Sequence, residues 1–170
     1  VAELSGYLWL FPRPDHVGVG ICAPLGGVPT REMIGRLEHE VARSFPALLE
    51  QDAARYAHTI PSPSADPRSI LEIAGPRWAL VGDAAALADP ISGEGIFFAL
   101  RSARVLAETL RQTGSAAGYP ARAFEDFGRE LTKGASLRDR FYGPRMTSRM
   151  VSYAARSRAI ETRRPAGLVL

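Results

Sequence analysis

Apolar and polar positions in the first fifty residues follow two different periods, which predict a β-hairpin and then a helix. Residues 6–11 are rich in aromatic side chains and residues 16–22 alternate β-branched side chains with glycine, so both segments are predicted to be strands joined by a turn. Thr30, a residue type that caps helices, begins a segment in which apolar residues recur every three or four positions. That spacing predicts one helix whose buried stripe is made of Ile34, Leu37, Val41, Phe45 and Leu48.

Shorter apolar segments predict two further strands. Residues 53–60 are expected to form a strand, and the proline-rich stretch 61–67 is expected to be a connection. The compact apolar run 78–81 is followed directly by Gly82 and Asp83. Such a run suits a strand that is buried on both faces in an α/β sheet.

Two longer stretches have the period of a helix. The first is predicted from Gly93 to Gln112, with Gly114 placed to end it. Its predicted buried stripe consists of Ile96, Ala99, Leu100, Ala103, Leu106 and Leu110. The second begins near Ala121, and its apolar spacing predicts the burial of Phe124, Phe127 and Leu131.

Composition narrows the class of protein. The 170 residues are 46% hydrophobic and 23% charged, which is typical of a globular protein and excludes a disordered or collagen-like chain. The single cysteine, Cys22, cannot pair within the chain, so a disulfide framework is excluded and a reducing compartment, the cytoplasm, is expected. No apolar run reaches the ~20 residues that a membrane-spanning helix needs.

Positive charge is concentrated near the end of the chain. The formal net charge is +3, yet residues 145–170 hold six arginines and one acid, Glu161, so the preceding residues sum to −2. A basic tail can contact nucleic acid, an anionic membrane surface or another part of the same protein. Because no nucleic-acid-binding signature accompanies it, no nucleic-acid partner is expected. A solvated or partner-covered tail is the favoured interpretation, with peripheral membrane contact as the alternative.

Two motif-like stretches fail the context that their chemistry requires. Residues 18–23 match the letters of a dinucleotide-binding turn, but Pro24 prevents the helix that must follow. His39 and Glu40 begin like a zinc-protease motif, but Arg43 stands where the second zinc ligand belongs. No metal site is therefore expected.

Features that together indicate a ligand site lie between Asp83 and the predicted helix start. Asp83 follows a predicted buried strand, at the edge where open α/β sheets bind ligands, and its carboxylate can accept hydrogen bonds from a polyol. Ser92 can cap the helix, and Gly93 and Gly95 leave its first turn without side chains, so a planar or anionic group can approach the free N–H groups. The structural alternative is that the glycines only permit close packing and that Asp83 is a simple cap.

Two motifs resemble those of known families. Residues 82–85 and 89–96 resemble the second flavin-binding motif of FAD-dependent oxidoreductases built like aromatic hydroxylases. Residues 6–13, followed by a Val-Gly-Val-Gly strand, resemble the Tyr-x-Trp-x-Phe-Pro segment of the geranylgeranyl reductase family. At Arg13 members usually have lysine, so the charge is kept while the donor geometry changes. The resemblance covers roughly residues 5–145.

This resemblance implies a cofactor site and a substrate surface. It implies FAD as cofactor, with Asp83 on the ribityl chain after the turn at Gly82, and with Pro90 beside the isoalloxazine ring. The pyrimidine edge of the ring would meet the start of the next helix at Gly93, Glu94, Gly95 and Ile96. The substrate-domain sheet would line a pocket for an apolar small-molecule substrate with Tyr7, Trp9 and Phe11. A plain sheet core is an equally good interpretation of these aromatic residues.

The implied fold class is α/β, or an α+β fragment of it. The chain is expected to be the C-terminal half of an FAD/NAD(P)-binding flavoprotein fold. Residues 1–74 would be part of the substrate-binding domain, with a β-hairpin, a helix and a strand that contribute to its sheet. Residues 75–144 would be the C-terminal part of the FAD-binding domain, with one strand and the helices that follow. Residues 145–170 would be a basic tail that can be helical. The missing N-terminal half is an expected partner, so the chain alone is expected to bind FAD poorly. Sheet edges and apolar surface left exposed are expected to cause self-association.

The expected function is that of an FAD-dependent oxidoreductase similar to geranylgeranyl reductases. Reduced flavin would transfer hydride to a carbon–carbon double bond of an isoprenoid or another apolar substrate, with NAD(P)H or another reductant as electron donor. A flavin-dependent monooxygenase or halogenase-like enzyme is one alternative, and a truncated, non-catalytic flavoprotein fragment is another. The catalytic residues stay unassigned, although Tyr7 and Cys22 are candidate proton donors.

Overall fold

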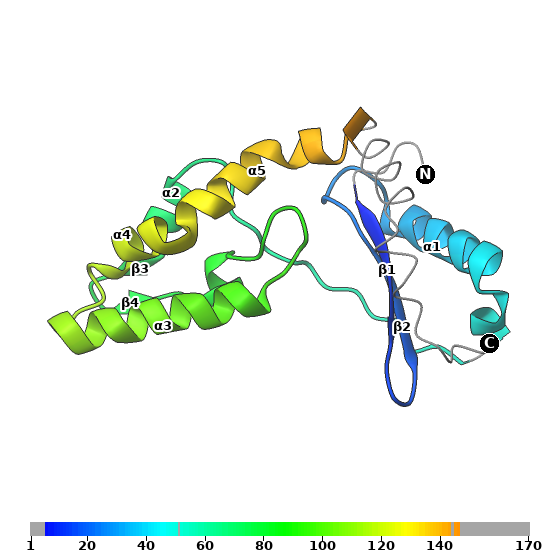
Figure 1. Ribbon diagram of the computed structural model, residues 1–170, viewed down its shortest axis with the longest axis horizontal. Helices are drawn as coiled ribbons and strands as arrows, with labels where there is room; N and C mark the ends of the chain where they lie inside the picture. Colours follow the sequence, from blue (N-terminus) through cyan, green and yellow to red (C-terminus); the bar gives the residue numbers. More distant parts are fainter. Residues whose placement is uncertain (1–5, 51, 144, 147–170) are drawn as a thin grey trace, which may run out of the picture. The chain divides into compact units, whose positions relative to one another are not determined.

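The computed structural model describes residues 6–50, 52–143 and 145–146 and divides the chain into two compact units. The first unit contains a hairpin and one long helix, and the second contains residues 57–141 (Figure 1). From position 147 onward the predicted basic tail lies outside the described residues. The expected domain boundaries after residues 74 and 144 refer to a larger flavoprotein and stay predictions.

The first unit begins with the predicted β-hairpin. Strands β1 (Tyr7–Pro12) and β2 (Val17–Cys22) pair in antiparallel register, with Trp9 opposite Gly20 and Phe11 opposite Gly18. A β-carbon at Gly20 would lie 2.0 Å from Cζ2 of Trp9, so the missing side chain leaves the space that the indole fills. Aromatic side chains also cover glycines across strand pairs in designed sheets. The glycine at position 20 is therefore a packing requirement of the hairpin.

The predicted helix after the hairpin is present but ends earlier than its apolar period suggests. Helix α1 spans Thr30–Ser44, and a 3-10 helix at Pro46–Glu50 follows it. Phe45 leaves the helical conformation, at φ −146°, because the residue before a proline disfavours the α region. Thr30 makes no capping hydrogen bond with its side chain, and Pro29 occupies the cap position. The predicted capping role of Thr30 is therefore wrong.

The segment from residue 52 onward has less strand structure than the sequence predicts. Residues 52–60 adopt no regular structure, so the strand predicted at 53–60 is wrong; the described strands pair only within their own two-stranded sheets. The strand predicted at 78–81 is reduced to β4 (Trp78–Ala79), which pairs antiparallel with β3 (Ala74–Gly75). Trp78 is 50% exposed, so β4 is not buried on both faces within this chain.

Helices form the rest of the second unit and pack around one core (Figure 1). They are α2 (Arg68–Leu71), α3 (Ile96–Thr113), α4 (Tyr119–Ala123) and α5 (Arg129–Phe141), with a π-helical turn at Phe124–Gly128 between the last two. Gly114 ends α3 at a φ of 69°, as predicted. The predicted burial of Phe127 and Leu131 is confirmed, and Phe124 is partly buried. The other large, fully buried side chains of this core include Ile70, Leu87 and Tyr119.

Helix α3 turns a different face to this core than its sequence predicts. The buried residues are Phe98, Ser102, Val105 and Thr109, whereas Ile96 and Leu100 of the predicted stripe are 78% and 70% exposed. The buried face carries two hydroxyl side chains and the exposed face is more apolar, so hydrophobic periodicity selects the wrong side. The helix thus has an uncovered apolar stripe, which we define as Ile96, Phe97, Leu100 and Leu110.

The described chain is a mixture of helices and two small sheets, which is compatible with the predicted α/β fragment. Its strand pairs are antiparallel. Among the helices that the structure describes, none combines the length and the apolar character needed to cross a bilayer.

Candidate functional site

Asp83 lies in a tight turn that follows strand β4. The turn is a 3-10 helix at Gly82–Ala85, and Gly82 begins it with a positive φ of 54°. A β-carbon at Gly82 would lie 2.8 Å from Cβ of Ala99 on α3, so both the backbone conformation and the available space require glycine. The N–H of Ala86 donates to the Asp83 carbonyl at 3.0 Å and closes the turn. This turn holds Asp83 close to helix α3.

Asp89 organises the loop that leads from this turn into α3. Its Oδ1 accepts hydrogen bonds from the N–H groups of Ile91 (3.0 Å) and Ser92 (2.6 Å) and from the Ser92 hydroxyl (2.9 Å). The Asp89 N–H donates to the Glu94 carbonyl, and the Asp89 carbonyl accepts from the N–H of Gly93, each at 2.9 Å. Sequence reasoning did not assign this role, although the signal exists, because aspartate readily accepts hydrogen bonds from the backbone that follows it in turns.

Ser92 does not cap α3, so its predicted role is wrong. Its hydroxyl accepts a hydrogen bond from the N–H of Glu94 at 3.3 Å, inside the loop. Helix α3 begins at Ile96 rather than at Gly93, with Gly95 at the cap position and no side-chain cap. Gly93 instead adopts a φ of 73°, which glycine allows without strain. The first N–H groups of an 18-residue helix are thus left without a capping side chain.

The start of α3 faces Asp83. A β-carbon at Gly95 would lie 2.8 Å from Oδ1 of Asp83, so the glycine makes room for the carboxylate at the helix start. Asp83 is exposed and does not cap α3 with its side chain, so the alternative of a simple cap is not supported. The positive end of a helix dipole favours negative charge by about 0.3–1 kcal/mol, and its free N–H groups can bind an anion. The structure therefore brings together the two features that the sequence singled out as one site.

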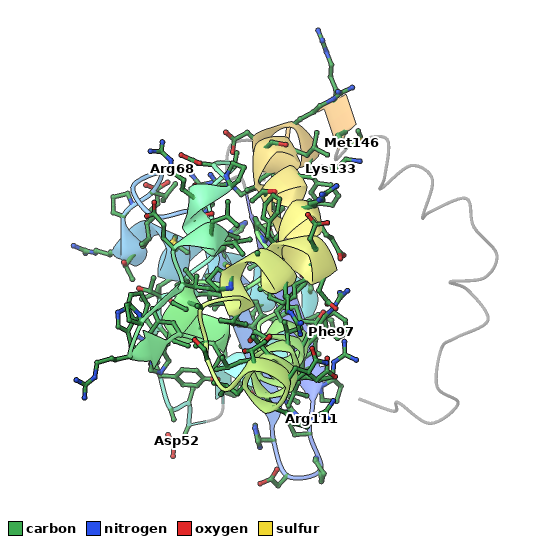
Figure 2. All side chains as sticks on the ribbon, turned by 90° about the vertical axis from the view of Figure 1, so that its left-hand side faces the viewer. Asp52, Arg68, Phe97, Arg111, Lys133 and Met146 are labelled. Carbon is green, nitrogen blue, oxygen red and sulfur yellow. The ribbon has the colours of Figure 1, made fainter. Side chains whose placement is uncertain are left out.

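An open pocket of about 320 Å³ lies beside this helix start. It is lined by Asp89, Ser92, Glu94, Phe97, Phe98 and Glu130, and Figure 2 labels Phe97 on α3. The volume lies at the lower end of the range for small-molecule sites. Because three of the six lining residues are carboxylic acids, the pocket suits a group that donates hydrogen bonds better than it suits a diphosphate. The Ile96 side chain belongs to the apolar stripe of α3 and does not line this pocket.

Helix α5 supports the loop from the other side. A β-carbon at Gly134 would lie 3.6 Å from Cδ of Pro90 and 3.9 Å from Oδ2 of Asp89, which are ordinary contact distances. Pro90 itself is buried within the chain. Helix α5 thus lies against the loop at a position where alanine would also fit, a contact between residues 44 positions apart that the local sequence pattern does not contain.

A cluster around Arg101 joins α3 to the π-helical turn. The guanidinium donates to the carboxylate of Asp126 and, at 2.7 Å, to the Asp126 backbone carbonyl. It also lies 5.5 Å from the ring centroid of Phe97 and 5.8 Å from that of Phe127, within cation–π distance. Sequence reasoning missed this cluster because Arg101 and Asp126 are 25 residues apart. The positive charge of Arg101 is already paired, so this residue is a structural link rather than a free anion-binding group.

The predicted substrate residues lie together on the hairpin of the first unit. The ring centroids of Tyr7 and Trp9 are 5.9 Å apart, and those of Trp9 and Phe11 are 6.5 Å apart. Phe11 is 54% exposed and the other two are half-buried, so these rings do not form a closed core within this chain. Tyr7 stands opposite Cys22; burial raises the pKa of the Cys22 thiol, and a hydrogen bond with Tyr7 opposes that rise. The two candidate proton donors are therefore neighbours across the hairpin.

Comparison with curated proteins finds relatives that are reductases. A menaquinone reductase of Mycobacterium tuberculosis is 30% identical over 136 residues, which cover 75% of this chain and 32% of that protein. A chloroplastic geranylgeranyl diphosphate reductase of Oryza sativa subsp. japonica is 35% identical over 140 residues, covering 81% of this chain and 27% of that protein. A digeranylgeranylglycerophospholipid reductase of Methanospirillum hungatei is 32% identical over 109 residues, covering 59% of this chain and 24% of that protein.

These relatives confirm the resemblance that the motifs predicted. Over part of its length, the chain is homologous to proteins named menaquinone reductase, geranylgeranyl diphosphate reductase and digeranylgeranylglycerophospholipid reductase. It spans about a fifth to a third of the length of the curated relatives that it matches. No family model matches the chain, and no solved structure gives a significant match.

Proposed function

We propose that this chain is part of an FAD-dependent oxidoreductase similar to geranylgeranyl reductases, which reduces a carbon–carbon double bond of an isoprenoid or another apolar substrate. One observation carries the proposal: the exposed carboxylate of Asp83 lies beside the uncapped start of α3, where a β-carbon at Gly95 would be 2.8 Å from its Oδ1. The reductase names of the homologues support the same class of reaction.

The residues at this site fit the middle part of a flavin cofactor. The Asp83 carboxylate, on the turn that begins at Gly82, would accept hydrogen bonds from the ribityl hydroxyl groups. The first N–H groups of α3, at Gly95 and Ile96, would stabilise the negative charge that a reduced flavin carries at its pyrimidine edge. Gly93 and Glu94 would shape the approach to that edge, and Pro90, which is buried against α5, would support the loop beside the ring. When bound, the flavin supplies the hydride, and the protein supplies binding, orientation and electrostatics.

The remaining part of the cofactor needs groups from outside this site. Three carboxylic acids line the pocket beside α3, and the nearby Arg101 is paired with Asp126. A diphosphate placed there would meet like charge, which opposes binding. We propose that the rest of a longer protein, the expected N-terminal half, contacts the diphosphate and adenosine and covers the apolar stripe of α3. The electron donor would be NAD(P)H or another reductant.

We propose that the aromatic face of β1, formed by Tyr7, Trp9 and Phe11, contacts the apolar substrate. Exposed aromatic rings over a glycine-bearing strand offer a flat apolar surface, and two of the homologues described above are named for substrates with geranylgeranyl groups. An apolar substrate would also be reached from a membrane surface, so we propose peripheral membrane contact. We propose that the protein is otherwise in the cytoplasm.

The test is FAD binding by the complete protein and by two glycine variants. In Gly95→Ala, the new β-carbon would meet Oδ1 of Asp83 at 2.8 Å and displace the carboxylate, so we expect FAD affinity to fall at least tenfold. Gly35→Ala is the matched control, because a β-carbon at Gly35 on α1 meets nothing within 4 Å. Flavin fluorescence titration measures both. Absence of FAD binding in the wild-type protein, or equal FAD affinity in Gly95→Ala, would contradict the proposal.

The reductase names of the homologues favour this reaction over flavin-dependent monooxygenation or halogenation and over a non-catalytic fragment. Mixing the reduced complete protein with air, in the presence of an apolar alkene substrate, separates the reactions. We expect the alkane product when a reductant is supplied anaerobically. A hydroxylated or halogenated product that requires oxygen would favour the alternative enzymes.

A further inference from the structure

We propose that Ser102 and Tyr119 are positioning residues of the flavin site, whose buried hydroxyl groups hold the backbone at 80–82 in the place from which Asp83 reaches the cofactor. The inference rests on the proposed function and adds two residues to it. Neither residue touches the ligand-facing side of the site, and each acts through the backbone that precedes Asp83.

Ser102 holds one side of this backbone. Its hydroxyl oxygen accepts a hydrogen bond from the N–H of Gly82 at 3.0 Å, and its hydroxyl group donates to the Ala99 carbonyl at 3.0 Å. The serine is completely buried on the inner face of α3. A buried backbone N–H that loses its partner is destabilising, because the loss of its hydrogen bond to water is no longer compensated. Ser102 therefore ties the first residue of the Asp83 turn to the helix whose start faces Asp83.

Tyr119 holds the other side. Its hydroxyl donates to the carbonyl of Leu80 at 3.1 Å, and the ring is completely buried in the core. Burial raises the pKa of Tyr119 to about 12, so the hydroxyl keeps its proton over the physiological range. The two side chains thus bind the backbone on either side of Val81 from inside the core.

The local secondary structure explains why side chains are needed here. Strand β4 ends at Ala79, so its two-residue ladder reaches neither the Leu80 carbonyl nor the Gly82 N–H. The Leu80 carbonyl instead finds its partner on α4, 39 residues away, and the Gly82 N–H finds its partner on α3, 20 residues away. Gly82 has a positive φ, and the position of Asp83 depends on the direction in which the chain leaves that residue. A shift of the backbone at 80–82 would therefore move the Asp83 carboxylate.

The experiment measures FAD affinity of the complete protein for Ser102→Ala and Tyr119→Phe, each of which removes one hydroxyl group. Thr109→Val is the matched control: Thr109 is equally buried on the same face of α3, but its hydroxyl donates within the helix, to the Val105 carbonyl at 2.7 Å. We expect roughly tenfold weaker FAD binding for the first two variants, the loss equivalent to about 1.4 kcal/mol, and less than a twofold change for the control. Circular dichroism confirms that each variant is folded at the temperature of the titration.

A double-mutant cycle with Asp83→Asn separates positioning from general stabilisation. If Ser102 and Tyr119 act through Asp83, each substitution weakens FAD binding much less when Asp83 is already replaced. Additive effects, or wild-type affinity in both hydroxyl-deletion variants, would overturn the inference while leaving the proposed function intact. Absence of FAD binding by the wild-type protein would overturn the proposed function itself.

Discussion

Two glycines of the candidate site leave space that a side chain would otherwise occupy. At Gly82 a β-carbon would collide with Ala99, and at Gly95 it would collide with the carboxylate of Asp83. Gly26 is different, because it has a positive φ of 83° but no neighbour within 4 Å, so conformation alone accounts for it. Gly35 has neither constraint. Replacement of glycine by alanine is therefore expected to disturb the structure at Gly82 and Gly95 and to be tolerated at Gly35, because the neighbouring atoms differ.

Also at the scale of single residues, the reactivity of the Cys22 thiol is expected to depend on pH in a way that Tyr7 changes. Burial raises the pKa of its thiol above the ordinary value, and the hydrogen bond with Tyr7 lowers it. Tyr7→Phe removes only the second effect, so the pKa rises further and less reactive thiolate is present at a given alkaline pH. We expect slower alkylation by iodoacetamide at pH 8–9 and a higher midpoint in the rate-against-pH profile.

The control for this prediction is Tyr56→Phe, which makes the same chemical change at an 85% exposed tyrosine that does not contribute to the Cys22 pKa shift. Cys22 is the only cysteine, so mass spectrometry reports its alkylation directly. Because the folded-state pKa is raised, the stability linked to this thiol is present below the unfolded-state pKa and is lost as pH rises through the folded-state value. Faster alkylation in Tyr7→Phe than in wild type would contradict the assignment.

At the scale of elements, the hairpin is organised by pairs of an aromatic residue and a glycine across two strands. Trp9 covers Gly20 so closely that an added β-carbon would lie within the indole, whereas a β-carbon at Gly18 would meet only the Phe11 carbonyl oxygen at 3.8 Å. The two glycines occupy the same face of β2, two residues apart. They are therefore a natural pair for comparison.

We expect Gly20→Ala to displace the Trp9 indole and to lower the free energy of unfolding by about 1–3 kcal/mol, as overpacking does. Gly18→Ala is expected to change it by no more than about 0.5 kcal/mol. Urea unfolding measures the difference, and Trp9 emission, recorded in a Trp78→Phe background, should shift only in Gly20→Ala. Equal losses in the two variants would mean that the indole does not occupy the space over Gly20.

Local signals account for the elements that sequence reasoning predicted correctly. The hairpin, helix α1 and the end of α3 at Gly114 depend on alternation, period and a glycine stop within a few residues. The meeting of Asp83 with Gly95 was also predictable, because both lie within one motif. Contacts between distant residues were not predictable, including the bonds of Ser102 and Tyr119 to the backbone at 80–82. The face of α3 was predicted wrongly because its buried side carries hydroxyl groups and its exposed side is more apolar.

At the scale of the whole molecule, the uncovered apolar stripe of α3 and the length of the relatives point in the same direction. Ile96 and Leu100 are 78% and 70% exposed, and they lie on the helix whose start forms the candidate site. The chain spans 32% of the Mycobacterium tuberculosis menaquinone reductase that it matches. Apolar patches of this kind usually mark an interaction surface. If the remainder of a longer protein covers the stripe, the stripe is exposed to water in the isolated chain and buried in the complete protein.

A charge placed in the stripe should therefore have opposite effects in the two contexts. In the isolated 170-residue chain, Leu100→Glu is expected to reduce self-association. It replaces a 70% exposed apolar side chain with a charged one, which makes the stripe less apolar and adds repulsion between copies. In the complete protein, the same change would bury an unpaired carboxylate and lower the melting temperature by several degrees. Leu25→Glu is the control, since Leu25 is 83% exposed in a loop of the other unit and lies outside the stripe. Sedimentation velocity at several concentrations follows the first effect and calorimetry the second. A monomeric wild-type chain would show that the stripe does not cause self-association, and an unchanged melting temperature in the complete protein would show that nothing covers the stripe.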